Sequence, residues 1–259
     1  MTTIAVIGLG AMGSRIAARL LASGLEVVVW NRSVGKTEPL VDVGARVALS
    51  PADAASTSDA VMTMVSDPEA LASIAEGGEG IFASTGSPTL IEMSTVGPAA
   101  IARLADRIPP RMALLDAPVL GSLSEVETGR LKIFVGGEEA LFRRWAPVLS
   151  ILGGPLFVGP SGSGAAAKLV ANTTLFGSIG VLAEALALAE ALGLGRSTAF
   201  EVLASTPIAA QAERRRPAIE SGEHPLRFSL SLARKDAELI GRAATDAGAE
   251  LRLAEAARS

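Results

Sequence analysis

The chain has 259 residues, a length that predicts two domains rather than one compact unit. Hydrophobic residues make up 49% and charged residues 19%, which excludes bulk disorder, while aromatic residues reach only 3%, so the core must be built from Ala, Val, Leu and Ile. The formal net charge of −4 excludes a typical nucleic-acid binder, because such proteins usually carry a basic face.

Two residue counts limit the chemistry further. The chain has no cysteine, which excludes disulfides and thiolate metal sites and fits a reducing compartment. Its single histidine, His224, stands between Glu and Pro in a predicted turn, so neither a Ser–His–Asp hydrolase nor a multi-histidine metal site is expected. A strand-like run starts at Thr3 with no basic region before it, and we expect a cytoplasmic protein without a signal peptide.

The first half of the chain alternates short apolar runs with helical patterns, which predicts a parallel sheet covered by helices. The strands are expected at 4–7, 26–30, 60–65, 90–94, 113–116, 133–135 and 156–158, and helices at 12–22, 98–107 and 138–149. These elements predict an α/β N-terminal domain over residues 1–160, with GPSGSG as the joint to the next domain.

Only helical patterns follow, which predicts an all-α C-terminal domain over residues 161–259. Its first helix, at about 164–192, would be about 30 residues and roughly 45 Å long, with further helices at 197–205, 210–219 and 229–247. The first helix is apolar on every face, which is typical of a membrane span or of a helix buried in protein, and Glu184 and Glu190 favour burial. The few remaining helices cannot cover it, so we expect a homodimer with this helix in the interface.

The stretch GLGAMG, residues 8–13, follows the apolar run IAVI and opens an amphipathic helical pattern. That context is typical of the dinucleotide-binding, or Rossmann-type, fold. Gly8 permits the tight turn, Gly10 lets the backbone approach a pyrophosphate, and Gly13 allows close helix–strand packing. We therefore expect residues Gly8, Leu9, Gly10, Ala11, Met12 and Gly13 to contact the cofactor, with the helix N-terminus facing its phosphates.

The end of the second strand favours NADP(H) over NAD(H). An NAD-binding fold places Asp or Glu there for the ribose hydroxyls, whereas this chain reads VVVWNRSVGK, with Asn31, Arg32, Ser33 and Lys36. A carboxylate would repel a 2′-phosphate, and Arg32 can clamp it while Ser33 and Lys36 add contacts. Ordinary surface residues are the alternative explanation.

Lys168 is the only charged residue between Arg144 and Glu184, within a segment of small apolar residues. In a helix it shares a face with Asn172, four residues later. An ammonium group in an apolar cleft loses hydration, so its pKa is expected to fall and it can exchange a proton with a carbonyl or hydroxyl oxygen. Asn172 would orient the substrate or hold the lysine. The alternative is a lysine whose stem packs on the core and whose head reaches water.

Four motifs follow one another along the chain: GLGAMG at 8–13, DAPVLGS at 116–122, GSGAAAKLVAN at 162–172 and the Lys-Asp pair at 235–236. Together they make the chain resemble the β-hydroxyacid dehydrogenase family, which includes 3-hydroxyisobutyrate dehydrogenases and glyoxylate/succinic semialdehyde reductases. The resemblance implies that Lys168 is the catalytic acid/base, that Asn172 contacts the substrate, and that Met64, Val65, Thr95 and Lys235 lie along the dinucleotide. In DAPVLGS, the backbone of Gly121 and Ser122 is able to hold a substrate carboxylate, although a plain turn fits equally well.

The chain departs from the family pattern at two places. Leu120 stands where relatives commonly carry a substrate-contacting serine, which favours a larger or more apolar substrate, and the chain stops at Ser259, where relatives usually run further.

Two other functions stay open. The first is imine reduction, because imine reductases share this architecture and prefer NADPH, and Leu120 is compatible with that function. Imine reductases usually carry another residue in place of the lysine, however, so Lys168 counts against it. The second is a non-catalytic nucleotide-binding scaffold, and Lys168 counts against this too, because such family members lose the lysine. The sequence thus favours an NADP-dependent oxidoreductase of a small semialdehyde or keto acid.

Overall fold

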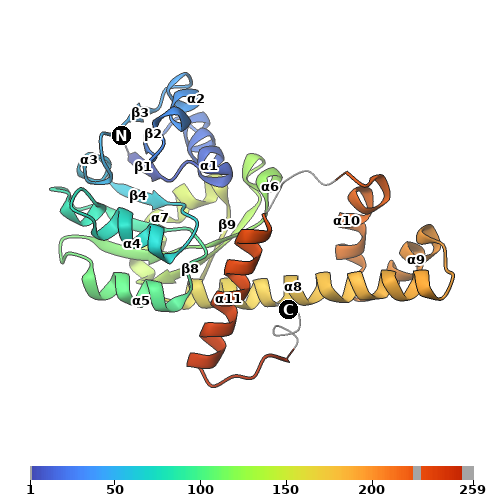
Figure 1. Cartoon of the computed structure of the whole chain (residues 1–259). Helices are drawn as coiled ribbons and strands as arrows, with labels where there is room; N and C mark the ends of the chain where they lie inside the picture. The colour runs from blue at the N-terminus through green and yellow to red at the C-terminus, as the bar shows by residue number, and fades with distance from the viewer. Residues whose placement is uncertain (1, 224–228, 253–259) are drawn as a thin grey trace. The chain divides into compact units, whose positions relative to one another are not determined.

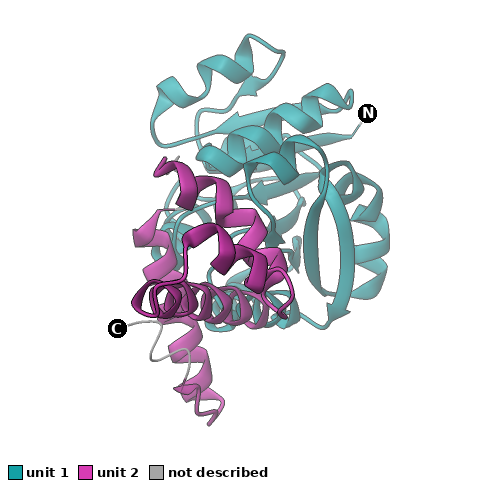
Figure 2. Cartoon of the chain, turned by 90° about the vertical axis from the view of Figure 1, so that its right-hand side faces the viewer, with its two compact units in different colours: residues 1–169 teal, residues 170–259 magenta. Residues whose placement is uncertain are grey.

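The computed structural model describes residues 2–223 and 229–252 and separates into two compact units, residues 1–169 and 170–259 (Figure 2). His224 and the chain end at Ser259 lie outside the described residues. The first unit holds a nine-stranded sheet with helices on both faces, and the second is helical in its described part (Figure 1).

The strands follow the apolar runs of the sequence. Most match their predicted positions to within a few residues, whereas β3 and β7 are two-residue strands that the sequence did not predict. The strands are β1 (Thr3–Ile7), β2 (Glu26–Trp30), β3 (Arg46–Val47), β4 (Ala60–Thr63), β5 (Thr89–Glu92), β6 (Ala113–Asp116), β7 (Val119–Leu120), β8 (Leu131–Gly137) and β9 (Gly153–Gly159).

Six strands form the expected parallel core, in the order β3-β2-β1-β4-β5-β6. At the other edge the sheet is mixed, because β8 runs antiparallel to both β6 and β7 and pairs in parallel with β9. The short β7 lies only a few residues after β6, so the chain reaches β8 without the long crossover that a parallel neighbour needs.

Two helices of the first unit, α3 and α4, begin at side-chain caps. Asp67 accepts a hydrogen bond from the backbone N–H of Ala70 at the start of α4, and Ser50 accepts one from Asp53 at the start of α3. The helices of the first unit are α1 (Ala11–Ala22), α2 (Glu38–Val41), α3 (Pro51–Ser56), α4 (Pro68–Glu76), α5 (Pro98–Arg107), α6 (Leu123–Glu127) and α7 (Glu139–Leu152), with 3₁₀ turns η1 (Val34–Lys36) and η2 (Ile81–Ala83).

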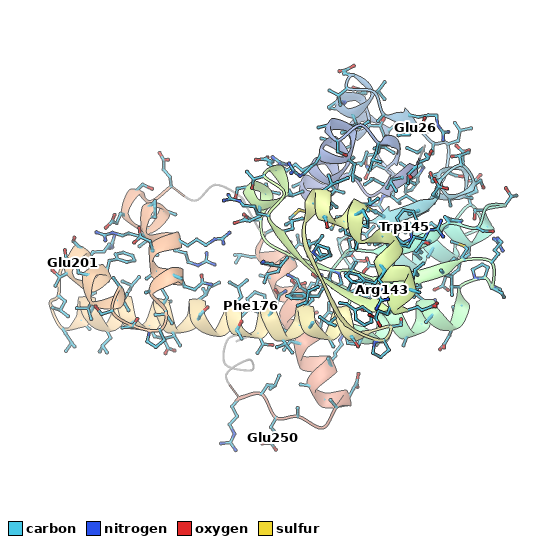
Figure 3. The ribbon with its side chains drawn as sticks, turned by 180° about the vertical axis from the view of Figure 1, so that it is seen from behind. Glu26, Arg143, Trp145, Phe176, Glu201 and Glu250 are labelled. Carbon is cyan, nitrogen blue, oxygen red and sulfur yellow. The ribbon has the colours of Figure 1, made fainter. Side chains whose placement is uncertain are left out.

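Two buried clusters fill the two faces of the sheet, since successive strand residues point to opposite sides. On one face Ile4 and Val6 pack with Ile16 of α1 and Trp145 of α7, and on the other Ala5 and Ile7 pack with residues of α3, α4 and α5. Trp145, labelled in Figure 3, donates its indole N–H to the Thr89 hydroxyl at 2.9 Å, so its buried polar group is paired.

The helix α8 (Ser163–Ala191) begins in the first unit and continues into the second. The remaining helices are α9 (Arg196–Leu203), α10 (Ala209–Ser221) and α11 (Leu230–Asp246). Phe200 and Leu203 of α9 pack with Leu182 of α8 and Ala212 of α10 in a small apolar core. Among the described residues, α8 is long and apolar enough to span a membrane by length and composition, a test that core helices of soluble proteins also pass.

Candidate functional site

The glycine-rich loop joins β1 to α1 at the carboxyl edge of the parallel strands. Gly8 has a φ of +95°, which favours glycine, and its N–H donates to the Trp30 carbonyl at 3.0 Å. A Cβ on Gly13 would collide with the Gly8 carbonyl oxygen, whereas a Cβ on Gly10 would have no neighbour within 4 Å. The three glycines therefore have different roles: Gly8 and Gly13 close the turn, and Gly10 leaves open space beside the helix.

The N-terminus of α1 can serve as an anion site. Its N-cap is Gly10, which has no side chain to cap the helix, and Ala11 and Met12 form the first turn. The first N–H groups of a helix have no partner within the helix and carry its positive partial charge. With the open space at Gly10, this cradle has the shape and polarity that a dinucleotide pyrophosphate needs.

Asn31 ties this loop to the end of β2. Its Oδ1 accepts the N–H of Leu9 at 2.9 Å, and its Nδ2 donates to the Ser33 carbonyl at 3.0 Å. Arg32, Ser33 and Lys36 follow on the exposed surface of the same segment. The segment thus carries two exposed cations close in sequence to Asn31, and no carboxylate.

The loops after β4 and β5 are joined by a hydrogen-bonded chain that sequence reasoning missed. The Val65 N–H donates to the Ser94 hydroxyl at 2.8 Å, and the Ser94 N–H donates to Glu92 Oε1, also at 2.8 Å. Glu92 is fully buried. The predicted cofactor residues Met64, Val65 and Thr95 lie in these two loops. The sequence signal for these hydrogen bonds was the presence of Glu92 and Ser94 at the end of an otherwise apolar strand.

In the DAPVLGS loop, the carboxylate of Glu125 accepts hydrogen bonds from Ser122, which was predicted to donate them to the substrate. Both the N–H and the hydroxyl of Ser122 donate to Glu125 Oε2, at 2.8 and 2.6 Å, in a capping box at the start of α6. Gly121 has a φ of +143°, and Leu120 is half-buried. The spacing of Ser122 and Glu125 was the signal for the capping box, and sequence reasoning did not use it.

The residue that begins this motif, Asp116, lies against the start of α8. Its carboxylate accepts the N–H groups of Gly162 and Ala165 at 2.9 and 2.8 Å. Burial raises the pKa of this carboxyl, and the backbone N–H donors oppose that effect only in part. Lys168 follows on the same helix and is 8% exposed.

In the second unit, a single carboxylate joins two of the predicted site residues. Asp236 Oδ2 accepts the side-chain amide of Asn172 at 2.8 Å, and its Oδ1 forms an ion pair with Lys235 Nζ at 2.6 Å. Asn172 and Asp236 are both buried. Asp236, which the sequence reasoning gave no role of its own, holds both neighbours in fixed orientations.

No group of three or more His, Asp or Glu side chains suited to a metal ion occurs within residues 2–223 and 229–252. The site instead combines a strand–glycine turn–helix unit with backbone donors at the carboxyl edge of a parallel sheet. That arrangement defines a dinucleotide-binding protein.

The comparisons with known proteins give the family. Residues 3–159 match the NAD-binding domain of 6-phosphogluconate dehydrogenase, and residues 162–259 match the NAD-binding domain of NADP-dependent 3-hydroxyisobutyrate dehydrogenase. The chain belongs to the β-hydroxyacid dehydrogenase family, the oxidoreductases that include these 3-hydroxyisobutyrate dehydrogenases. The resemblance drawn from the four motifs is confirmed.

Three similar proteins illustrate the range of this fold. Glyoxylate/succinic semialdehyde reductase 2 of Arabidopsis thaliana is 34% identical over 92% of this chain and 67% of its own length. The 3-hydroxyisobutyrate dehydrogenase of Mycobacterium tuberculosis, solved with L-serine, superposes with a TM-score of 0.90 at 28% identity, over 100% of this chain and 91% of that one. An imine reductase of Myxococcus stipitatus in complex with NADP⁺ shares the fold, with a TM-score of 0.74 at 21% identity, over 100% and 92%.

Proposed function

We propose that this protein is an NADP-dependent oxidoreductase that interconverts a small semialdehyde or keto acid and the corresponding hydroxy acid. The observation that carries the proposal is Lys168, an ammonium group only 8% exposed on a helix of small apolar residues. Burial of a cation is costly, and buried ionisable groups cluster at functional sites. Lys168 also lies in the segment that matches the model of NADP-dependent 3-hydroxyisobutyrate dehydrogenase, and the resemblance through GSGAAAKLVAN supports the role of acid/base.

The chemistry follows from the groups that this chain supplies. NADPH, when bound, supplies a hydride to the carbonyl carbon. Lys168 gives a proton to the carbonyl oxygen, so that the C=O double bond becomes a C–H and an O–H bond, and the neutral amine regains its proton from water. In the opposite direction the neutral amine takes the hydroxyl proton. Asn172 follows four residues later in the helix, donates its side-chain amide to Asp236, and in this proposal contacts the substrate.

The cofactor contacts are proposed for residues of the first unit. Gly10 and the N-terminus of α1 bind the pyrophosphate, and Arg32, with Ser33 and Lys36, binds the 2′-phosphate. The loops that carry Met64, Val65 and Thr95 line the nicotinamide side of the sheet edge.

Imine reduction is the second candidate. Leu120 is half-buried at the end of β7, where it offers no hydroxyl to a substrate oxygen. A hydrophobic side chain at that position fits a cyclic imine as well as an aldehyde. Lys168 argues for the carbonyl reaction, because a carbonyl oxygen must receive a proton as hydride reaches the carbon, whereas an imine that is already protonated in solution reacts with hydride alone.

The test is a panel of semialdehydes, keto acids and cyclic imines, assayed with NADPH and with NADH. We expect NADPH oxidation with a semialdehyde or keto acid, and a fall in kcat of at least about 100-fold in Lys168→Ala, since general acid–base catalysis contributes about that much. Lys132→Ala is the matched control, because Lys132 is an exposed lysine on β8. Undiminished turnover in Lys168→Ala would remove the proposed acid/base, and activity on imines alone would favour the second candidate.

The long helix α8 supports a further part of the proposal, a homodimer. Its apolar residues Val170, Val181 and Leu188 are 66%, 48% and 60% exposed in the single chain. Apolar surface of this kind is usually covered by a partner. Analytical ultracentrifugation should give a dimer that Val181→Glu dissociates, while Leu49→Glu, at an exposed position of the first unit, should leave it intact. A monomeric wild-type chain would overturn the dimer.

A further inference from the structure

Asp116 joins two segments that lie far apart in the sequence. Its two carboxylate oxygens accept the backbone N–H groups of Gly162 and Ala165, 46 and 49 residues later. The side chain is fully buried at the end of β6, where the carboxyl edge of the parallel strands lies. This carboxylate therefore attaches the start of α8 to the sheet.

The first turn of α8 takes hydrogen-bond acceptors from outside the helix, and Asp116 is one of them. This turn contains no acidic residue, and the residue before it, Gly162, has a φ of +90° and no side chain. The N–H groups of a first helical turn need acceptors from outside the helix, and a negatively charged acceptor there also interacts favourably with the positive end of the helix dipole. Asp116 supplies two of these acceptors, and the Pro160 carbonyl accepts the N–H of Ser163 at 3.0 Å.

The packing around the carboxylate leaves the start of α8 no room to move. A Cβ on Gly136 would lie 2.5 Å from Asp116 Oδ1, and a Cβ on Gly164 would lie 2.5 Å from the Phe134 carbonyl oxygen and collide with that of Asp116. The backbone of α8 thus begins in direct contact with β6 and β8. A shift of the first turn would break these contacts.

Lys168 follows Ala165 by three residues on this turn. Because the backbone of a helix is rigid, the contacts that fix the N–H of Ala165 also fix where the Lys168 side chain begins and in which direction it points. We infer that Asp116 is a positioning residue for Lys168: it holds the first turn of α8 so that the ammonium group is presented at one place. This inference rests on the proposed function, because it gives Asp116 its role through the acid/base.

A cap that served stability alone would behave differently. It would lower the thermal stability of the protein and leave the kcat of the remaining folded molecules unchanged. A positioning residue lowers kcat in the folded enzyme, and its effect disappears when Lys168 is already absent, because two residues that act through one another do not add.

The experiment compares Asp116→Asn, Lys168→Ala and the double variant, with succinic semialdehyde and NADPH. Asparagine turns an N–H group toward one of the helix amides, so one hydrogen bond is lost. We expect Asp116→Asn to lower kcat by about 10-fold to 100-fold, the effect of a small displacement of a catalytic group, while the KM for NADPH changes less than about twofold. The double variant should have the kcat of Lys168→Ala.

Two controls keep the result decisive. Asp53→Asn is the first control. The carboxylate of Asp53 accepts the Leu49 N–H at 2.9 Å, outside the proposed site, so its loss should leave kcat unchanged. In the wild-type protein, hydrogen exchange should be as slow at the amides of Gly162 and Ala165 as in β6, and this measurement needs no variant to fold.

Three results would overturn the positioning role: an unchanged kcat in soluble Asp116→Asn, multiplicative losses in the double variant, or rapid exchange at the two amides. An unchanged kcat in Lys168→Ala would instead defeat the proposed function. The two failures are therefore distinguishable.

Discussion

Glu92 and Asp116 are paired Cα positions at the ends of the neighbouring parallel strands β5 and β6, and both are fully buried. Each carboxylate binds backbone N–H groups of a segment outside its own strand: Glu92 binds Ser94, and Asp116 binds Gly162 and Ala165. Buried polar groups are tolerated when they are hydrogen-bonded. The two residues thus anchor the loop after β5 and the start of α8 at the same edge of the sheet.

The hydrogen bonds that link Glu92, Ser94 and Val65 give the first prediction. Ser94→Ala removes the acceptor of the Val65 N–H, so the loop that carries Met64 and Val65 is held less firmly. Loss of one such hydrogen bond costs about 0.5–1.5 kcal/mol, and NADPH affinity should fall by up to about tenfold. Fluorescence titration with NADPH measures it.

Ser84→Ala is the matched control for that prediction, because Ser84 is also buried and its hydroxyl has no hydrogen-bond partner within the described residues. Its NADPH affinity should remain that of the wild type. Equal affinities in the two variants would show that the hydroxyl of Ser94 does not support the cofactor loop.

The glycine loop gives a paired prediction in which similar substitutions fail for different reasons. Gly10→Ala places its methyl group in open space, so the protein should unfold at the wild-type temperature and yet bind NADPH at least about tenfold more weakly, because the methyl occupies the path of the pyrophosphate. Gly13→Ala drives a methyl into the Gly8 carbonyl and should cost about 1–3 kcal/mol of stability.

Thermal unfolding and NADPH titration separate the two effects. Unchanged NADPH affinity in Gly10→Ala would mean that the cofactor does not approach this part of the backbone. A Gly13→Ala protein of wild-type stability would contradict the close packing of α1 against the loop.

Arg32 gives the prediction on cofactor choice. The side chain is exposed after β2, and no carboxylate stands in the Asn31–Lys36 segment. Arg32→Ala should lower the ratio of kcat/KM for NADPH to that for NADH by about tenfold or more, since hydrogen bonds to charged groups contribute about 1.5–3 kcal/mol. Arg143→Ala, an exposed arginine on α7 that pairs with Glu139, should keep the wild-type ratio. A wild-type enzyme that used NADH equally well would refute the role of Arg32.

The sequence predicted the larger elements because their patterns are local. Buried parallel strands appear as continuous apolar runs, and the helix expected at 98–107 has the observed bounds of α5. The short helices α3 and α4 were missed, although Ser50 with Pro51 and Asp67 with Pro68 are start signals. The antiparallel direction of β8 was also missed, because the periodicity of a strand contains no information on which neighbour it pairs with.

The residues of the candidate site also fall into those that a local pattern identifies and those that it does not. The glycine motif and Lys168 stand out within short windows of sequence, whereas the partners that hold the site come from distant residues. Asp116 meets Gly162 across 46 residues, and Asn172 meets Asp236 across 64. Such pairs depend on the packing of complete elements, so a single sequence without its fold does not reveal them.

Asp116 also gives a prediction on pH. Burial raises the pKa of its carboxyl above the ordinary value of 3.8, although the N–H groups of Gly162, Ala165 and Gly164 act in the opposite direction. The folded state then holds this proton more tightly than the unfolded chain does. Its contribution to stability is therefore complete below pH 3.8 and is lost as the pH rises through the raised pKa of the folded state.

Urea denaturation of the wild type and Asp116→Asn over a series of pH values measures this contribution, because asparagine does not titrate. The free energy of unfolding of the wild type, minus that of the variant, should decrease as the pH rises from about 3.8 toward neutrality. An increase over the same range would mean that the backbone N–H groups stabilise the carboxylate by more than its burial costs. The cap of α8 would then be strongest in its ionised form, the form present at the pH of the enzymatic assay.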